Sequence, residues 1–329
     1  MTRILYTGDW HLRGTTPRNR KDNYKESIKE KLLEIFNLAR YRQVDAIITA
    51  GDTFHTPEVA TGVLLEFAEL IAENCPVPLY TTAGNHDIYG YNLDTYNRTS
   101  LRVLEKIVPQ LEVINDPSVP RFIGGIGDFP EVQLTFTPYS AEIDKNGYGY
   151  SPAYNSKADV KIHVAHGMLL DHTPPFDRFT LIKDVTTTAD LVLTGHDHTG
   201  YGIYERADGK TFVNCGAICR LSASQTEITR KIEVLLIDIQ NGKFDLELIP
   251  LQSAKPGEEI LDRSAIEREQ ERQYAMEEFA SLIQSNTGEK VLVDVNSIIE
   301  SIADQEGYSP TVVKIALEKI AESKETLRA

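Results

Sequence analysis

Five short segments of the chain contain side chains of the types that bind divalent metal ions. They are Thr7-Gly8-Asp9-Trp10-His11, Ala50-Gly51-Asp52, Gly84-Asn85-His86-Asp87, Ala165-His166-Gly167 and Gly195-His196-Asp197-His198. Each follows an apolar, β-branched run, so each is predicted to be a loop at the carboxyl end of a strand, where open α/β sheets place their ligand sites. Carboxylates suit hard cations and imidazoles suit borderline ones. The five loops therefore predict one common metal site.

Two adjacent cations need hard or borderline ligands and one carboxylate able to bridge them, and the segments offer that set. Asp9 and His11 are separated by one residue, and His196 and His198 have the same spacing. A single Asp at a strand end often caps the next helix, and a single His is often a hydrogen-bonded core residue. The number of histidines favours metal binding over these ordinary roles, because five of the eight histidines lie in the segments. The histidines outside them are His55, His163 and His172.

The elements that must position the loops follow from hydrophobic periodicity. Helices are expected at residues 22–42, 57–73 and 99–108, and buried strands at residues 3–8, 44–50 and 77–83. Pro57 is allowed in the first turn of the second helix. This alternation of strands and helices predicts right-handed crossovers and a largely parallel first sheet.

From about Leu111 the pattern changes to short strands with turn signals. The signals are Gly124-Gly125, Asn146-Gly147, Asp208-Gly209 and Asn241-Gly242, and the strands are residues 160–165, 191–194, 212–214 and 232–239 paired with 244–251. Asn-Gly and Asp-Gly pairs between apolar runs favour hairpins. Alternation puts His163 on the face opposite His166. The second half is thus expected to supply a second sheet, giving an α/β (α+β) sandwich of two sheets flanked by helices.

A linker-like stretch, residues 255–259, suggests a domain boundary after Ala254. We expect a catalytic domain at residues 1–254 and a small helical C-terminal region at residues 255–329. Its expected helices are residues 264–284, 295–304 and 309–324, the last with Ser309-Pro310 as its start signal. This region could dock a partner or pack on its own domain as a lid, and the sequence favours neither.

Composition limits the function classes. The 329 residues are 41% hydrophobic, enough for a sizeable core, and no stretch of 18 apolar residues suggests a membrane span. The start of the chain runs into a strand without a secretion signal, so a cytoplasmic protein is expected. Three scattered cysteines predict neither a disulfide framework nor a structural zinc site. The net charge of −15 argues against nucleic-acid binding through the global field.

The ordered set of motifs resembles that of calcineurin-like metallophosphoesterases, over residues 4 to about 250. The resemblance implies that one metal is held by Asp9, His11, Asp52 and His198. It implies that the other metal is held by Asp52, Asn85, His166 and His196. Asp52 would then be the bridging carboxylate, and a bridging water or hydroxide the nucleophile. His86 would act on the scissile phosphate as general acid or electrostatic stabiliser, with Asp87 orienting its ring.

Within this family the chain looks most like the SbcD-type DNA nuclease subunits, including phage versions. The residues concerned are Gly8-Asp9-Trp10-His11-Leu12, Val44-Asp45-Ala46-Ile47-Ile48, Gly51-Asp52-Thr53-Phe54-His55 and the segment Asn214 to Arg220. The protein-phosphatase signature Gly-Asp-x-x-Asp-Arg-Gly is not present in the second motif. The resemblance implies manganese-dependent DNA exonuclease and endonuclease action in recombination or repair. It also implies a homodimer and an SMC-like ATPase partner of the SbcC type.

Two other functions remain open at this point. A stand-alone phosphodiesterase or phosphatase for nucleotides or other small substrates is mildly favoured by the acidic charge. A scaffold with a degenerate site is disfavoured by the full ligand set. Tyrosines at Tyr89, Tyr91 and residues 139–154 could stack on unpaired bases, although tyrosines in Gly-rich loops more often pack their own loop. The basic run from Arg13 to Lys21 could hold a DNA backbone, but such runs are usually solvated.

Overall fold

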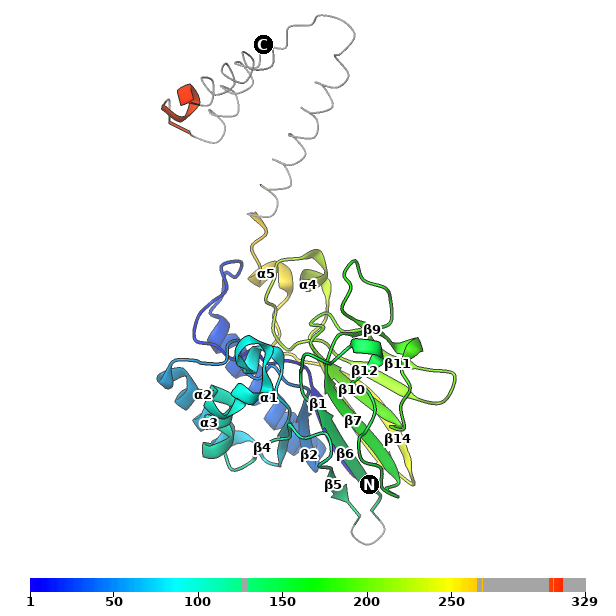
Figure 1. Ribbon diagram of the computed structural model, residues 1–329. Coiled ribbons are helices and arrows are strands. Elements are labelled where there is room, and N and C mark those ends of the chain that lie inside the picture. The colour runs from blue at the N-terminus through cyan, green and yellow to red at the C-terminus, as the bar shows by residue number, and fades with distance from the viewer. Residues whose placement is uncertain (126–128, 265–267, 269–307, 310, 316–329) are drawn as a thin grey trace, which may run out of the picture. The chain divides into compact units, whose positions relative to one another are not determined.

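The computed structural model describes residues 1–125, 129–264, 268, 308–309 and 311–315. The chain divides into two compact units, Met1–Ser264 and Ala265–Ala329. All the metal-ligand candidates lie in the first unit, whose strands and helices are shown in Figure 1. The expected helices at residues 264–284 and 295–304, and most of that at 309–324, lie outside the described residues. Residues 311–315 are helical.

The first sheet has the strand order β14-β13-β1-β2-β3-β4. Its strands are β1 (Thr2–Thr7), β2 (Ala46–Thr49), β3 (Leu79–Thr81), β4 (Leu111–Val113), β13 (Glu233–Gln240) and β14 (Lys243–Pro250). Strands β1 to β4 run parallel, as the alternation of strands and helices predicted. The β13-β14 hairpin forms across Asn241-Gly242 with Ile239 opposite Phe244, also as predicted. It joins the first sheet, antiparallel to β1, so the expectation that the second half supplies the second sheet is wrong for this hairpin.

The second sheet has the order β11-β12-β10-β7-β6-β5. Its strands are β5 (Arg121–Gly124), β6 (Glu131–Thr137), β7 (Val160–His166), β10 (Leu191–Gly195), β11 (Gly202–Glu205) and β12 (Thr211–Asn214). Strands β6, β7, β10 and β12 are parallel, and the edge strands β5 and β11 are antiparallel. A short parallel pair, β8 (Leu169–Leu170) and β9 (Thr180–Leu181), lies outside this sheet.

Alternation along β1 shows how the sandwich is built. Ile4 and Tyr6 are buried between the two sheets, together with residues such as Val164 and Leu193 of the second sheet. Leu5 faces the other way and packs in the core beneath the helices. Burial of both faces explains why Ile4, Leu5 and Tyr6 form a continuous apolar run at the centre of the strand, as in central parallel strands generally. Figure 1 shows the helices α1, α2 and α3 on the outer side of the first sheet.

The helices cover the first sheet as predicted, with one error. They are α1 (Tyr24–Arg42), α2 (Thr61–Asn74) and α3 (Ser100–Ile107), with the smaller α4 (Gln225–Thr229) and α5 (Gly257–Ile260) later in the chain. The Asn23 side chain caps α1 by accepting from the Glu26 amide. Pro57 does not lie in the first turn of α2, which begins at Thr61. The Pro57 carbonyl instead accepts from the Ser100 amide at 2.7 Å and so joins this loop to α3.

Asn146-Gly147 does not form the predicted hairpin turn. Both residues have positive φ, but they lie in a short 3-10 turn, η4 (Lys145–Gly147), within a loop that follows β6. The other short turns are η1 (Asn85–Asp87), η2 (Tyr89–Tyr91), η3 (Leu93–Arg98) and η5 (Ile182–Asp184). The Asn-Gly pair did indicate the backbone conformation correctly, because Asn and Gly both tolerate the left-handed region. It carried no information about which strands flank it.

Residues 255–264, assigned from the sequence to the C-terminal region, belong to the first unit. The Ile260 carbonyl accepts from the Lys21 amide at 2.9 Å, and Asp262 donates its amide to the Asn19 carbonyl at 2.9 Å. The side chains of Ile260 and Leu261 are buried. Across the described part of the chain, no helix combines the length and apolar character needed to span a membrane. Cys75, Cys215 and Cys219 are free and buried.

Candidate metal centre

The predicted ligands meet where strands of both sheets end. Asp9 follows β1, Asp52 follows β2 and Asn85 follows β3, all in the first sheet. His166 ends β7 and His196 follows β10, both in the second sheet. The carboxyl ends of the parallel strands in the two sheets therefore face one another, and the five loops form a single site.

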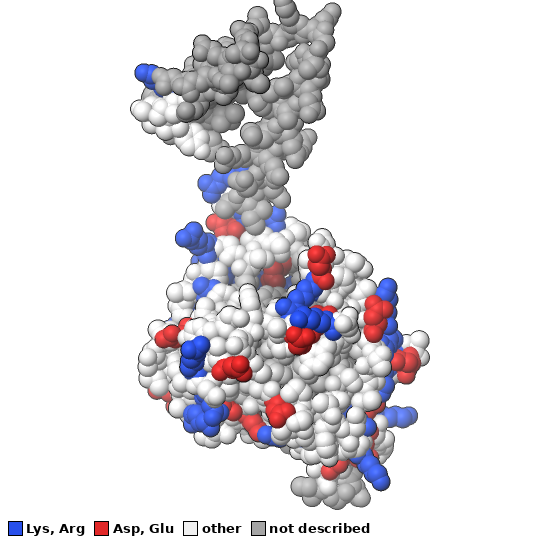
Figure 2. All heavy atoms as spheres, in the orientation of Figure 1, with Lys and Arg blue, Asp and Glu red and all other residues white. Residues whose placement is uncertain are grey.

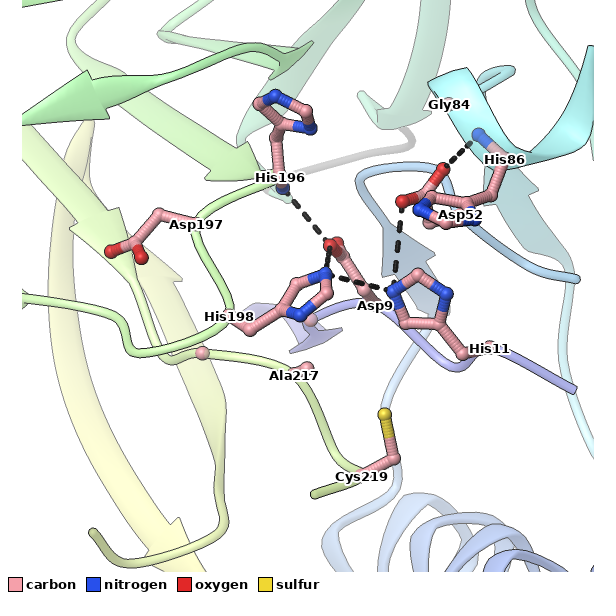
Figure 3. Close-up of polar contacts among 12 residues, drawn as sticks. Asp9, His11, Asp52, Gly84, His86, His196, Asp197, His198, Ala217 and Cys219 are labelled. Atoms are coloured by element: carbon pink, nitrogen blue, oxygen red, sulfur yellow. Dashed lines mark hydrogen bonds and ion pairs between the residues drawn. The ribbon is translucent and has the colours of Figure 1, made fainter. Parts of the chain in front are cut away.

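The first ligand group contains Asp9, His11, Asp52 and His198, whose ligand atoms all lie within 4.8 Å of one another. The two imidazole Nε2 atoms of His11 and His198 are 2.8 Å apart. His11 Nε2 lies 3.6 Å from Asp52 Oδ2, and His198 Nε2 lies 3.5 Å from Asp9 Oδ2. Figure 3 shows these side chains turned toward one another. This is the set that the resemblance assigned to one metal.

The second group contains Asp52, His166 and His196, again with ligand atoms within 4.8 Å. His166 Nε2 lies 3.5 Å from Asp52 Oδ2 and 3.0 Å from Asn85 Oδ1. Asp52 Oδ2 is thus within 3.6 Å of a ligand from each group. One carboxylate oxygen lies between the two sets, the arrangement that a bridging ligand requires.

The buried oxygens at the centre fit divalent cations. Asp9 Oδ1 and Asp52 Oδ2 are buried and accept no hydrogen bond in the described structure. An unpaired buried carboxylate oxygen costs several kcal/mol unless a cation or donor satisfies it. Imidazole nitrogens and an amide oxygen complete the donor set, which suits borderline metals such as Mn²⁺ or Zn²⁺. The residues present therefore fit two metal ions.

Backbone hydrogen bonds fix the first loop to the second. The amides of Trp10 and His11 both donate to the Asp52 carbonyl, at 3.2 and 2.9 Å. Leu12 and Phe54 form an isolated parallel bridge. The Trp10 ring is fully buried and donates through Nε1 to Thr7 Oγ1 at 2.7 Å. Trp10 therefore serves as the anchor of the loop, which holds Asp9 and His11 beside Asp52.

Three of the candidate ligand residues have left-handed backbone conformations. The φ angles of His11, Asp52 and His196 are 49°, 48° and 77°. Non-glycine residues rarely adopt this region, and such strain concentrates at functional sites where the surroundings enforce it. Gly84 and Gly195 complete the packing, since a Cβ there would lie 2.1 Å from Asp52 Oδ1 and 2.3 Å from Asp9 Oδ1. The glycines of the motifs thus make space for the ligand carboxylates.

Hydrogen bonds to their remaining polar atoms orient the ligands. His166 directs Nδ1 to the Ala50 carbonyl at 2.8 Å, which leaves Nε2 for the metal side. Asp9 Oδ2 accepts from the His196 amide at 3.0 Å, and Asp52 Oδ1 accepts from the His86 amide at 2.9 Å. Such contacts fix the orientation of a ligand and its tautomer.

The protonation states suit metal binding only in part. Burial lowers the pKa of His196 to about 3 and that of His198 to about 4, so both rings are neutral at pH 7, the form that binds a metal ion. Burial, reinforced by Asp52, raises the pKa of Asp9 to about 8. Burial alone would lower the pKa of His166, but the carboxylates of Asp52 and Asp9 raise it to about 9. The metal-free protein therefore carries protons on Asp9 and His166 that a cation must displace.

We expect Mn²⁺ binding to release protons and to tighten as the pH rises. Protons compete with the metal at Asp9 below about pH 8 and at His166 below about pH 9, and each released proton changes the affinity about tenfold per pH unit. Calorimetric titrations at pH 6.5 and 8, in buffers of different ionisation enthalpy, measure both quantities. Asp9→Asn should release one proton fewer. An affinity that is the same at both pH values contradicts this competition.

His86 lies at the site, but Asp87 does not orient its ring. His86 Nδ1 is 2.7 Å from the His55 carbonyl oxygen. The fully buried Asp87 carboxylate accepts from the amides of Thr53, Phe54 and Gly84. The expectation that Asp87 orients His86 is therefore wrong. Asp87 instead stabilises the loops after β2 and β3, and the His55 carbonyl holds the ring.

His55 is the residue that the sequence reasoning left out. Its Nδ1 is 3.4 Å from His11 Nδ1, and its ring stacks on His86 with centroids 5.1 Å apart. His11, His55 and His86 together form a third group of ligand atoms within 4.8 Å. Its position three residues after Asp52, in the same loop, could have indicated that His55 lies at the site. The remaining histidines lie elsewhere: His163 bonds Thr135 and the Gly149 carbonyl, away from His166 as predicted, and His172 is exposed.

Comparison with known proteins agrees with this geometry. The family model for calcineurin-like phosphoesterases matches residues 2–200. The SbcD subunit of the SbcCD nuclease of Bacillus subtilis (strain 168) is 35% identical over 88 residues, which are 26% of this chain and 22% of that protein. The match thus spans less than a quarter of the relative's length.

Solved structures with a similar arrangement share little sequence with the chain. TT1561 of Thermus thermophilus is 16% identical, with a TM-score of 0.44 over 75% of this chain and 98% of that one. GAP50 of Plasmodium is 15% identical, with a TM-score of 0.49 over 78% of this chain and 85% of that one. A dimetal phosphatase from Danio rerio is 10% identical, with a TM-score of 0.45 over 76% and 96%. Because the family model extends from β1 to beyond the last ligand histidine, more than half of the chain, this protein belongs to the calcineurin-like phosphoesterase family.

Proposed function

We propose that the protein is a dinuclear metal-dependent DNA phosphodiesterase, acting as exonuclease and endonuclease in recombination or repair. Membership of the family supports hydrolysis of phosphoesters. The observation that carries the choice of DNA is the 35% identity to a nuclease subunit over 88 residues. A DNA substrate of this kind implies a cytoplasmic location. We propose Mn²⁺ as the metal at both positions.

The site residues have separate roles in this proposal. Asp9, His11, Asp52 and His198 hold one cation, and Asp52, Asn85, His166 and His196 hold the other. When bound, two cations lower the pKa of an attacking water and neutralise charge that develops in an in-line displacement. Asp87 holds the loops in place, and His86 acts on the scissile phosphate.

The orientation of His86 assigns Nε2 to the substrate, and proton donation from Nε2 to the leaving group requires the doubly protonated ring. A carbonyl only accepts hydrogen bonds, so His86 Nδ1 carries the proton that it shares with the His55 carbonyl at 2.7 Å. Nε2 is then the nitrogen that can serve the substrate. The His86 amide also donates to Asp52 Oδ1 at 2.9 Å, which ties its position to the carboxylate common to both ligand groups.

A small-molecule phosphodiesterase is the second candidate, and charge is the observation that favours it. The net charge is −15, and the described face in Figure 2 shows acidic and basic side chains interspersed, without a continuous basic area. Proteins that hold DNA by its phosphates usually present such an area. The nuclease proposal therefore needs the metals, local contacts or a basic partner to bind DNA.

Cleavage of defined DNA separates the two candidates. Linear duplex and single-stranded oligonucleotides are incubated with the purified protein and Mn²⁺ or Mg²⁺, with Asp52→Ala as the inactive control. The nuclease proposal predicts Mn²⁺-dependent shortening or nicking that the control lacks. Hydrolysis of thymidine 5′-p-nitrophenyl phosphate without any cleavage of DNA would establish the second candidate instead.

We further propose that residues 1–254 form the nuclease domain and that residues 255–329 serve partner docking or act as a lid. The partner would be an SMC-like ATPase of the SbcC type, with the nuclease as a homodimer. A truncation test should end after Ser264, because Ile260 and Leu261 are buried within the first unit.

We expect the chain truncated after Ser264 to keep its phosphodiesterase activity and to lose binding to a co-expressed SMC-like ATPase. Its core is retained, since Met1–Ser264 is one compact unit. Activity on an aryl phosphodiester and co-purification with the ATPase are measured side by side. Undiminished ATPase binding removes the docking role, and a gain in activity on truncation identifies a lid.

A further inference from the structure

A pair of tyrosines lies against the second ligand group. The Tyr139 ring packs on the metal-ligand histidines, with centroid distances of 5.5 Å to His196 and 6.2 Å to His166. Tyr91 packs on Tyr139 at 5.7 Å. Tyr139 is 7% exposed, whereas Tyr91 is 61% exposed. The two rings therefore extend from the buried histidines to the solvent, and Tyr91 is the outer one.

A cation lies over the same aromatic ring. The guanidinium carbon of Arg178 is 5.3 Å from the Tyr139 centroid. Its Nη2 donates to the carbonyls of Ser140 and Ile143, at 2.7 and 3.3 Å. These contacts use one nitrogen of the five-donor guanidinium group, which leaves further donors for a phosphate. An aromatic surface and a positive charge thus lie together beside His196.

The loops that carry these residues are held firmly. Asp144, in the loop of Tyr139, accepts from the Met168 amide at 3.0 Å, from Thr180 Oγ1 at 2.9 Å and from the Tyr150 hydroxyl. The first two donors flank the segment that contains Arg178. Tyr139 also donates its amide to the Ala83 carbonyl at 2.9 Å, directly before the third motif. The arrangement is therefore built by several crosslinks between loops, as a binding site requires.

Tyr91 is held in a conformation that its own packing does not explain. Its φ is 59°, in the left-handed region that bulky residues rarely adopt. Tyr89 in the same turn has clear partners, because its hydroxyl donates to Glu58 at 3.0 Å and Arg98 lies over its ring. The Tyr91 ring meets Tyr139 at a tilted interplanar angle of 51° and is 61% exposed. Such strain at an exposed residue points to a function of the ring.

We propose that Tyr91, Tyr139 and Arg178 form a stacking site for an unpaired nucleobase next to the metal centre. Tyr91 supplies the free ring face, Tyr139 supports it from the ligand side, and Arg178 faces the adjoining phosphate. Stacking on an aromatic ring accepts any base, so the site selects single-stranded or frayed DNA without reading its sequence. This inference rests on the proposed phosphodiesterase function and names the substrate form that this site takes.

The two interpretations of the tyrosines, base stacking and packing within a loop, apply to different residues. Tyr150 is buried and its hydroxyl donates to Asp144 of its own loop, as tyrosines in such loops usually do, whereas Tyr139 is buried against His166 and His196. Tyr91 differs from both, because most of its ring is exposed. The proposal therefore depends on Tyr91, and replacing it leaves the metal ligands and their supports unchanged.

The test compares substrates with and without a base. Single-stranded oligonucleotides carry either normal terminal nucleotides or abasic tetrahydrofuran residues, and thymidine 5′-p-nitrophenyl phosphate is compared with its abasic analogue. Tyr91→Ala should lower kcat/KM about tenfold on substrates with a base, in the range of one lost stacking contact, and leave the abasic substrates unchanged. Tyr91→Phe should behave as wild type. Tyr41→Ala is the matched control, since Tyr41 is 83% exposed near the end of α1.

A second measurement needs no metal and no turnover. An oligonucleotide with 2-aminopurine at one end is titrated with protein in EDTA, and stacking quenches its fluorescence. Wild type, Tyr91→Phe and Tyr41→Ala should quench, whereas Tyr91→Ala should not. Equal losses on base-bearing and abasic substrates, or equal quenching by Tyr91→Ala, overturn the proposal. A wild type that hydrolyses only the thymidine ester contradicts the DNA function, while its abasic comparison still decides the stacking site.

Discussion

Replacing Asp52 with alanine is expected to remove both metal ions and to lower phosphodiester hydrolysis about 10³-fold or more. Asp52 Oδ2 lies within 3.6 Å of His11 and 3.5 Å of His166, so one substitution takes a ligand from each group. Two bound cations stabilise transition-state charge by several kcal/mol, and about 1.4 kcal/mol corresponds to tenfold in rate. Metal content by mass spectrometry and kcat/KM on an aryl phosphodiester measure the two effects.

Asp197→Asn is the control for Asp52→Ala. Asp197 stands between two ligand histidines in the sequence, but its carboxylate accepts from the amides of Thr199 and Gly200. Figure 3 shows it pointing away from the ligand group. Asparagine keeps one acceptor oxygen, so this variant should retain two metal ions and most of the activity. If Asp52→Ala also retained two ions per chain and normal hydrolysis, Asp52 would not be the shared ligand.

The clustering of the candidate ligands could be predicted because it depends on one local rule. Each ligand follows an apolar run, and parallel strands bring their carboxyl ends to one edge. The positions of Asp9, Asp52 and His166 in the chain are therefore enough to expect them together, although the loops of two sheets contribute. The fold was predictable for the same reason, since the crossovers of β1 to β4 leave few alternatives.

The errors concern contacts between loops, which no periodicity encodes. The bridge from Leu12 to Phe54 brings His55 beside His11. This bridge lies outside the strands, so the hydrophobic pattern of the strands does not indicate it. The role of Asp87 follows from the amides that happen to face it after folding. The β13-β14 hairpin was predicted with its register, but the choice of β1 as its neighbour depends on which sheet edge is free.

Replacing His86 with alanine is expected to leave both metal ions bound and to reduce DNA cleavage about 10²- to 10⁴-fold, the usual contribution of a general acid or base. His86 is not a member of either ligand group that contains Asp52. Its ring is instead positioned by the His55 carbonyl. The measurements are metal content and kcat/KM on DNA. His172→Ala is the control, because the His172 side chain is 70% exposed. Near-normal cleavage by His86→Ala would refute a role in turnover.

The leaving group decides between the two ways in which His86 could act. An alkoxide such as the deoxyribose oxygen needs a proton as it departs, whereas p-nitrophenolate departs without one. If His86 is a general acid, His86→Ala should lose much more activity on DNA than on thymidine 5′-p-nitrophenyl phosphate. If it stabilises charge on the phosphate, the losses on both substrates should be similar, because that charge develops with either leaving group. Since Nδ1 is bonded to a carbonyl, only Nε2 can serve in either role, and the ratio of the two losses measures which one it performs.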